Sequence, residues 1–73
     1  MQHYKDLDHD SGVVGYEIGD THITVWFDGT AKSYTYSYKG AGVEHVEKMK
    51  KLADAGEGLN AYINKFVKFK YDR

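Results

Sequence analysis

The fold is decided by residues 14–38, VGYEIGDTHITVWFDGTAKSYTYSY, in which apolar and polar side chains alternate. Successive side chains of a strand point to opposite faces, so this alternation predicts half-buried strands. Two pairs that contain glycine, Gly19-Asp20 and Asp28-Gly29, interrupt the alternation and are typical of two-residue hairpin turns. The stretch therefore predicts a three-stranded antiparallel meander.

The two predicted turns can be tested through the residues that they bring together. Gly19-Asp20, as a two-residue turn, places Tyr16 opposite Ile23. Asp28-Gly29 places Ile23 opposite Tyr34. Both registers put the same eight residues on one face of the sheet: Val14, Tyr16, Ile18, Ile23, Val25, Phe27, Tyr34 and Tyr36. Because a one-residue slip would scatter this set over both faces, we expect it to form the core beneath a helix. The tyrosines are then core residues rather than a stacking platform for nucleic acid.

The apolar pattern changes to a helical period after residues 39–42. The stripe of the predicted first helix consists of Val43, Val46, Met49, Leu52 and Ala53. Gly56 suits the position that ends this helix, and Asn60 can cap a second, shorter one. Residues 67–71 alternate again, which leaves a short fourth strand and an extended edge segment as alternatives. The predicted class is α+β, in the order βββα-α.

Length and composition limit the classes of protein that are possible. The chain has 73 residues, 41% of them hydrophobic, which suits one small domain. We expect residues 1–10 to form a flexible acidic arm and residues 11–73 a single α+β domain. Cysteine is absent, the N-terminus is too polar for a signal peptide, and no apolar run approaches the ~20 residues of a membrane span. The expected location is the cytoplasm, without membrane attachment.

Side chains that could carry chemistry form no convincing site. Asp6, Asp8 and Asp10 have the spacing of the first ligands of a calcium loop. The glycine of such a loop comes one residue late, at Gly12, and no helix can precede it, so a solvated acidic arm is favoured. The four histidines, at positions 3, 9, 22 and 45, lack the helical spacing of a metal-binding pair. With no catalytic or phosphate-binding motif either, we expect no metal, no cofactor and no enzymatic activity.

An ordered series of short motifs resembles the KTSC domain, a small domain named for the C-terminus of some lysyl-tRNA synthetases. The series consists of residues 11–16 (SGVVGY), Ile23-x-Val25-x-Phe27-x-Gly29, Tyr34-x-Tyr36 and residues 56–63 (GEGLNAYI). Two departures are Gly40 and Gly42, where the family usually has a proline, and Leu59, where it usually has an aromatic residue. The resemblance implies a βββα module. It implies no established catalytic residue, and it links the chain to nucleic acid only through the fold.

The sheet face opposite the predicted core suggests a surface for a protein partner or a second copy. The two-residue turns place Trp26 there between Val13 and Ala31, with His22 beside it. Tryptophan is enriched at interface hot spots, so this face predicts protein–protein or self-association, including a homodimer. Local packing of Trp26 over Val13 and Gly15 explains the pattern equally well.

The basic C-terminal residues suggest an alternative function. Residues 1–31 carry six acidic and one basic side chain, whereas residues 32–73 carry nine basic and five acidic ones. Phosphate contacts of a nucleic acid would fall on the residues at the C-terminal end: Lys65, Lys68, Lys70 and Arg73. Ordinary solvated lysines are the simpler interpretation, since edge lysines also discourage aggregation.

Overall fold

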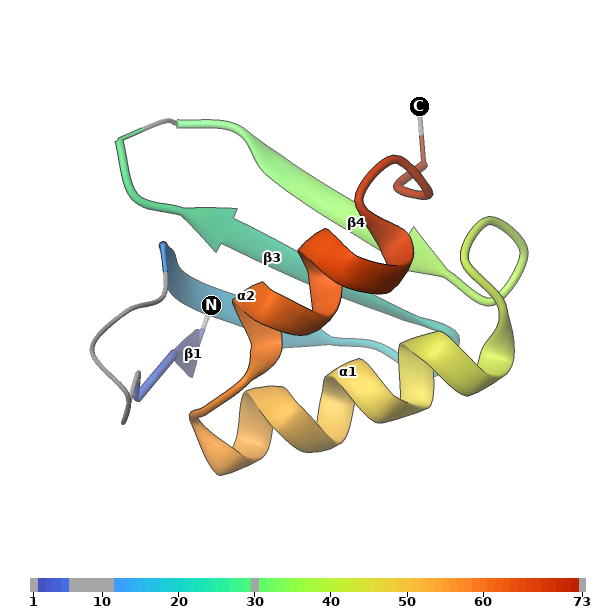
Figure 1. Ribbon diagram of the computed structural model, residues 1–73, viewed down its shortest axis with the longest axis horizontal. Helices are drawn as coiled ribbons and strands as arrows, with labels where there is room; N and C mark the ends of the chain where they lie inside the picture. Colours follow the sequence, from blue (N-terminus) through green and yellow to red (C-terminus); the bar gives the residue numbers. More distant parts are fainter. Residues whose placement is uncertain (1, 6–11, 30, 73) are drawn as a thin grey trace.

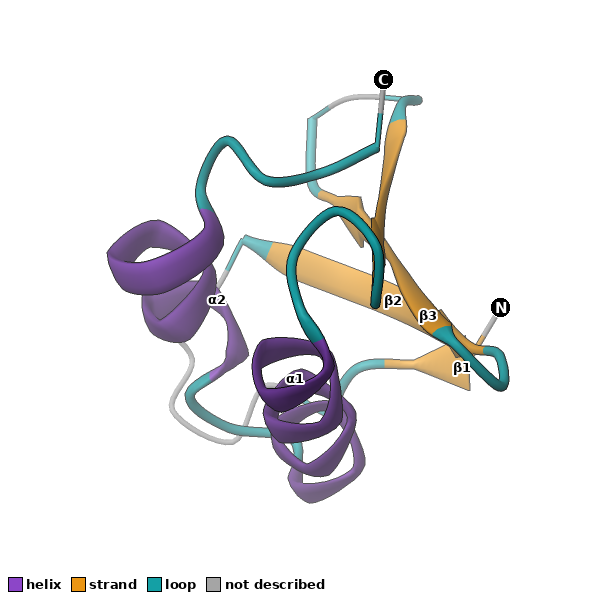
Figure 2. Cartoon of the chain, turned by 90° about the vertical axis from the view of Figure 1, so that its right-hand side faces the viewer, coloured by secondary structure: helices purple, strands orange, loops and turns teal. Residues whose placement is uncertain are grey.

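A computed structural model describes residues 2–5, 12–29 and 31–72. The strands are β1 (Gln2–His3), β2 (Val13–Ile18), β3 (His22–Phe27) and β4 (Ser33–Ser37), and the helices are α1 (Val43–Ala55), α2 (Leu59–Tyr62) and the π-helix η1 (Ile63–Val67). The strands form one antiparallel sheet in the order β1-β2-β3-β4 (Figure 1). Figure 2 shows the helices together on one side of this sheet. The predicted α+β class and the meander β2-β3-β4 are confirmed.

The sequence suggests residues 67–71 as a possible fourth strand, but the additional strand of the sheet is β1, at the N-terminal end of the chain. Gln2 and His3 pair with β2, whereas residues 67–71 contain the end of η1 and a turn. Tyr4, next to β1, is 6% exposed, and its hydroxyl accepts a hydrogen bond from the Leu59 backbone N–H at 3.2 Å. Residues 2–5 thus belong to the folded domain, which corrects the boundary drawn at residue 11. The acidic residues 6–10 lie outside the described residues.

Both hairpins have a register two residues away from the predicted one. Ile18 lies opposite Ile23, and Val25 lies opposite Tyr34. The first turn therefore consists of the four residues 19–22, of which His22 already belongs to β3, and a 2.9 Å hydrogen bond from the Gly19 N–H to the His22 carbonyl closes it. Gly19 has no positive φ, which the predicted two-residue turn needs. A Cβ there would lie 2.1 Å from the His22 ring, so glycine lets this ring lie over the turn and a larger residue would displace it. Because each register moves by an even number of residues, Tyr16, Ile23, Val25 and Tyr36 still share the buried face.

A β-bulge in β2 reverses the predicted roles of two valines. The pairing passes from Val13 opposite Phe27 to Gly15 opposite Trp26, which leaves Val14 as the extra residue. Such an insertion changes which side chains face the core on one side of the bulge. Val13 is consequently 2% exposed and Val14 39% exposed, the opposite of the prediction from strict alternation.

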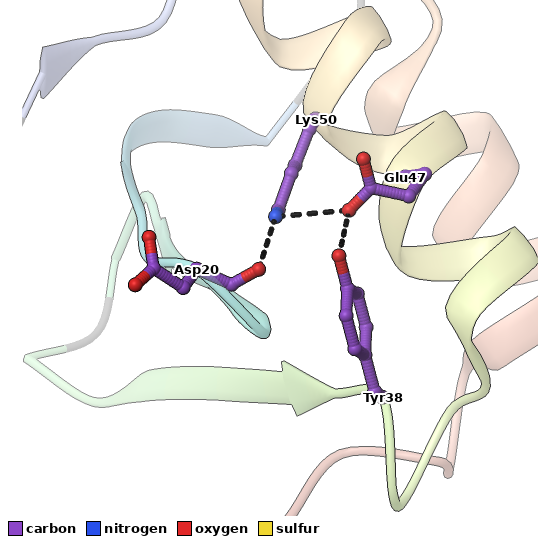
Figure 3. A network of polar contacts seen from close by, with 4 residues as sticks. All are labelled: Asp20, Tyr38, Glu47 and Lys50. Atoms are coloured by element: carbon purple, nitrogen blue, oxygen red, sulfur yellow. Dashed lines mark hydrogen bonds and ion pairs between the residues drawn. The ribbon is translucent and has the colours of Figure 1, made fainter.

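The helical layer closes the core over the sheet. Helix α1 buries Val46, Met49 and Ala53, and α2 with η1 buries Leu59, Ile63 and Val67. Gly56 follows α1 in the left-handed conformation, with φ of 80°, as predicted for the residue that ends this helix. A polar network joins α1 to the sheet (Figure 3). Lys50 Nζ donates to the Asp20 carbonyl at 3.1 Å and pairs with Glu47 at 2.9 Å, while the Tyr38 hydroxyl donates to the same carboxylate.

Candidate aromatic pocket

An open pocket of about 260 Å3 lies between the sheet, η1 and the C-terminal segment. Its lining combines five aromatic residues with one apolar, one amide and one basic side chain: Phe27, Tyr34, Tyr36, Phe69, Tyr71, Ile63, Asn64 and Lys68. Lys68 is the sole charged residue in this lining among the residues described. The pocket therefore offers aromatic surface and a positive charge at the same place.

The sheet supplies the rigid wall of this pocket. Tyr34 contacts Phe27 with ring centroids 5.6 Å apart, and Tyr71 with centroids 4.8 Å apart, both with the rings steeply inclined. Tyr71 also lies edge-on to Tyr36 at 6.4 Å. Edge-to-face pairs at these distances are favourable because the positive edge of one ring meets the negative face of the other. The rings hold each other in place before any ligand arrives.

The prediction that the tyrosines form the core holds for Tyr36 and only partly for Tyr34. Tyr36 is 1% exposed, and this burial, together with the nearby Tyr34 and Tyr71, raises the pKa of Tyr36 to about 12. Its phenol is therefore protonated at neutral pH. Tyr34 is half-buried and lines the pocket. The tertiary structure therefore leaves Tyr34 partly accessible, at the end of the sheet that α1 does not cover.

The helical wall of the pocket is the π-helix η1, a conformation that is rare and concentrated at functional sites. It buries Ile63 and Val67, so Lys65 and Phe66 are exposed. Phe69, in the turn after η1, is 68% exposed. The sequence gives no signal for a π-helix, because the buried residues of η1, Ile63 and Val67, are four apart, as they would be on an ordinary α-helix.

The lysines predicted as phosphate contacts lie on and after this helix. Lys65 Nζ is 5.3 Å from the centroid of the Phe66 ring, and Lys68 Nζ is 5.4 Å from that of Phe69. Within the described part of the chain, Lys65, Lys68 and Lys70 make no ion pair with a carboxylate. Their charge is thus available to an external anion. Arg73 lies outside the described residues.

The last wall is the C-terminal segment, residues 70–72, which runs back to β4. The Asp72 N–H donates to the Thr35 carbonyl at 2.7 Å, and Ser37 Oγ donates to Asp72 Oδ1 at 2.9 Å. A Cβ at Gly40 would lie 2.6 Å from the same carboxylate oxygen, so the absence of a side chain leaves room for it. These contacts place Tyr71 against Tyr34 at the pocket.

The predicted partner patch on the opposite sheet face is only partly assembled. Val13 is in the core rather than beside Trp26, which corrects its predicted position. Trp26 is half-buried and pairs with Gly15 and Ser33, not with Ala31. Ala31 is exposed before β4, and His22 is half-buried opposite Ser37. Local cover of Gly15 thus accounts for part of the burial of Trp26.

Metal ligation and membrane insertion also depend on how side chains are arranged in the described residues. They contain no group of three or more His, Cys, Asp or Glu side chains placed to hold a metal ion. The acidic series Asp6, Asp8 and Asp10 lies outside them. No helix in the described ranges has both the length and the apolar character needed to cross a membrane.

Comparison with family models, curated proteins and solved structures finds no match to this chain. The resemblance to the KTSC domain therefore stays a prediction. No functional residue can therefore be transferred from a relative.

Proposed function

We propose that this chain is a binding module for single-stranded nucleic acid, without chemistry of its own. The observation that carries the proposal is the combination at η1 and the following turn. There, three lysines free of carboxylate partners in the described structure are interleaved with the exposed rings of Phe66 and Phe69. Proteins that bind single strands combine basic side chains for the backbone with aromatic rings for the bases.

The size and charge of the pocket support this ligand class over a diffusible cofactor. Small-molecule sites usually enclose roughly 300–1,000 Å3, whereas this pocket has about 260 Å3 and is open. It suits one planar group that remains attached to a larger ligand. Its charged lining residue, Lys68, is positive, which matches a phosphate backbone.

The first prediction concerns the basic side chains of this surface. The triple variant Lys65→Ala/Lys68→Ala/Lys70→Ala should bind a fluorescent single-stranded oligonucleotide at least tenfold more weakly than the parent at low salt, because three phosphate contacts are lost. If all three lysines neutralise phosphates, raising the salt from ~50 to ~200 mM should weaken the parent roughly 20-fold. Fluorescence anisotropy measures both effects.

The matched control is Lys48→Ala/Lys51→Ala, which removes two exposed lysines of α1 outside the pocket. This variant should bind nearly as the parent does. If the parent shows no affinity for single-stranded DNA or RNA at low salt, the proposed function is wrong. Equal losses in the two variants would mean attraction by overall charge and would equally remove the assignment to η1.

Association through the sheet face opposite the core is a second candidate, supported by Trp26. The preceding residue, Val25, is buried in the core, so Trp26 points to the opposite face of the sheet. It lies in a row of paired residues that runs from His3 through Gly15 to Ser33. Gly15 has no side chain, so Trp26 has no large neighbour on β2 in that row. Half-buried tryptophans with such surroundings are typical anchors of protein interfaces.

The second prediction tests this surface by mass in solution. If the face mediates self-association, sedimentation should show a dimer for the parent and a monomer for Trp26→Ala, while the variant stays folded by circular dichroism. Val43→Ala, which shortens an exposed apolar side chain at the start of α1 in the helical layer, is the control and should leave the mass unchanged. A parent that sediments as a monomer at all concentrations excludes self-association.

A further inference from the structure

We infer that the aromatic pocket receives one unpaired base, and that Asp72 is a positioning residue that holds Tyr71 as its closing wall. This inference rests on the proposed function and specifies how the ligand is recognised. Binding would then depend on a base entering a preformed site, in addition to the attraction of phosphates to lysines.

The walls fit a flat aromatic group better than a branched apolar one. Five of the eight lining residues are aromatic, and they come from β3, β4, the turn after η1 and the C-terminal segment. Every base has a π-face, so ring stacking is available to each of them. A base that is paired in a duplex cannot enter such a pocket, since its edge and both faces are occupied.

The rim of the pocket provides groups for the edge of a base and for its phosphate. Asn64 is exposed, lines the pocket and makes no side-chain hydrogen bond to another described residue. Its amide therefore offers both donors and an acceptor, as the polar edges of bases require. Lys68 lies on the same helical side, one turn further along, where the phosphate attached to an inserted base can reach its ammonium group.

The C-terminal segment differs from the other walls because it is joined to the sheet through hydrogen bonds of Asp72. Backbone pairing of Asp72 with Thr35 and the hydrogen bond from Ser37 hold residue 72 against the edge of β4. Tyr71, the preceding residue, is thereby held 4.8 Å from Tyr34, centroid to centroid. Loss of the Asp72 carboxylate removes the Ser37 bond and should loosen this wall, although the backbone bond to Thr35 remains. The core side chains should stay untouched, because Asp72 is exposed.

The experiment compares a short oligothymidylate with an abasic oligomer of the same length and charge, using the full chain. Stacking of one base predicts that the parent binds the oligothymidylate roughly 5- to 100-fold more tightly. Tyr71→Ala should remove most of this preference and Asp72→Ala part of it, while the affinity for the abasic oligomer stays the same in both. Asp72→Asn keeps an acceptor oxygen for Ser37 and should retain the preference.

Thermal melting of each variant accompanies the binding data, so that a lost preference in a folded protein is separated from unfolding. Tyr62→Phe, which removes a hydroxyl bonded to His45 outside the pocket, is the control and should keep the preference. Equal affinity of the parent for the two oligomers would overturn the base-pocket inference and leave nucleic-acid binding by charge intact. Failure to bind either oligomer would instead overturn the proposed function itself.

Discussion

Single glycines of this chain show how the absence of one Cβ atom can determine where a segment packs. Gly56 and Gly29 have nearly the same positive φ, 80° and 81°. A Cβ on Gly29 would meet no atom within 4 Å, whereas one on Gly56 would lie 2.5 Å from the Cβ of Lys5. Gly56 thus ends α1 and also leaves room for the N-terminal segment to pack against this end of the helix. The sequence predicts the first role and gives no sign of the second.

The third prediction uses these two glycines as a matched pair. Gly29→Ala should lower the free energy of unfolding by about 1 kcal/mol, because a left-handed backbone disfavours a side chain. Gly56→Ala should cost about 1–3 kcal/mol more, since the added methyl group overlaps Lys5. Urea unfolding measures both values. Equal losses would mean that residues 2–5 do not pack against the α1–α2 junction in solution.

At the scale of elements, helix α1 is held to the sheet by apolar packing and by the network of Figure 3. The hydrogen bond from Tyr38, followed by that from Lys50, lowers the pKa of Glu47 below its ordinary value. The same bond to Glu47, with a smaller effect of burial, raises the pKa of Tyr38. Both shifts mean that the folded state favours a protonated Tyr38 phenol beside an ionised Glu47 carboxylate.

The fourth prediction follows from the sign of these shifts. A carboxyl whose pKa is lowered on folding stabilises the fold above its unfolded pKa, near 4.5, and this contribution is lost as the pH falls through the folded pKa. A phenol whose pKa is raised stabilises the fold below pH 10, and its contribution is lost as the pH rises through the folded pKa. Glu47→Gln should therefore flatten the acid limb of a plot of melting temperature against pH.

Glu44→Gln, one turn earlier on α1 and outside the network, is the control for this measurement. It should leave the acid limb of the parent unchanged. An acid limb that keeps its slope in Glu47→Gln would show that the network contributes nothing to acid stability, whatever its geometry.

For the whole molecule, the N-terminal segment links the two layers that the rest of the chain builds. Tyr4 follows the edge strand β1, is buried in the core and reaches the start of α2 through its hydroxyl. The first N–H groups of a helix have no partner within the helix, and the residue before α2, Gly58, supplies no side-chain cap. Tyr4 therefore satisfies a backbone group 55 residues away in the chain.

The fifth prediction is that Tyr4→Phe lowers the free energy of unfolding by about 1–3 kcal/mol, because the buried Leu59 N–H loses its partner. In a domain whose total stability is of order 5–15 kcal/mol, this is a readily measured fraction. Chemical denaturation gives the value, and Tyr62→Phe, whose hydroxyl is part-buried, should lose less. A smaller loss in Tyr4→Phe than in Tyr62→Phe would contradict the structure at this point.

The candidate pocket could be anticipated from the sequence only in its parts. Lys65, Lys68 and Lys70 stand out by charge, and Tyr34 and Tyr36 by alternation. Their meeting with Tyr71 and Phe69 depends on η1 and on the return of the C-terminal segment to β4. These features arise from contacts between distant residues, which a local period does not encode.

The sequence by itself determined the α+β class, the meander and the face of β3 that is buried, because side-chain periodicity is a local property and survives an even shift of register. Only the tertiary structure decided the four-residue first turn, the bulge at Val14, the strand β1 and the partial exposure of Tyr34 at the pocket. Each of these depends on which atoms come into contact in three dimensions, such as the His22 ring over Gly19 within the turn, Tyr4 beneath α2 and Asp72 beside Gly40. Such contacts are set by packing of the whole chain.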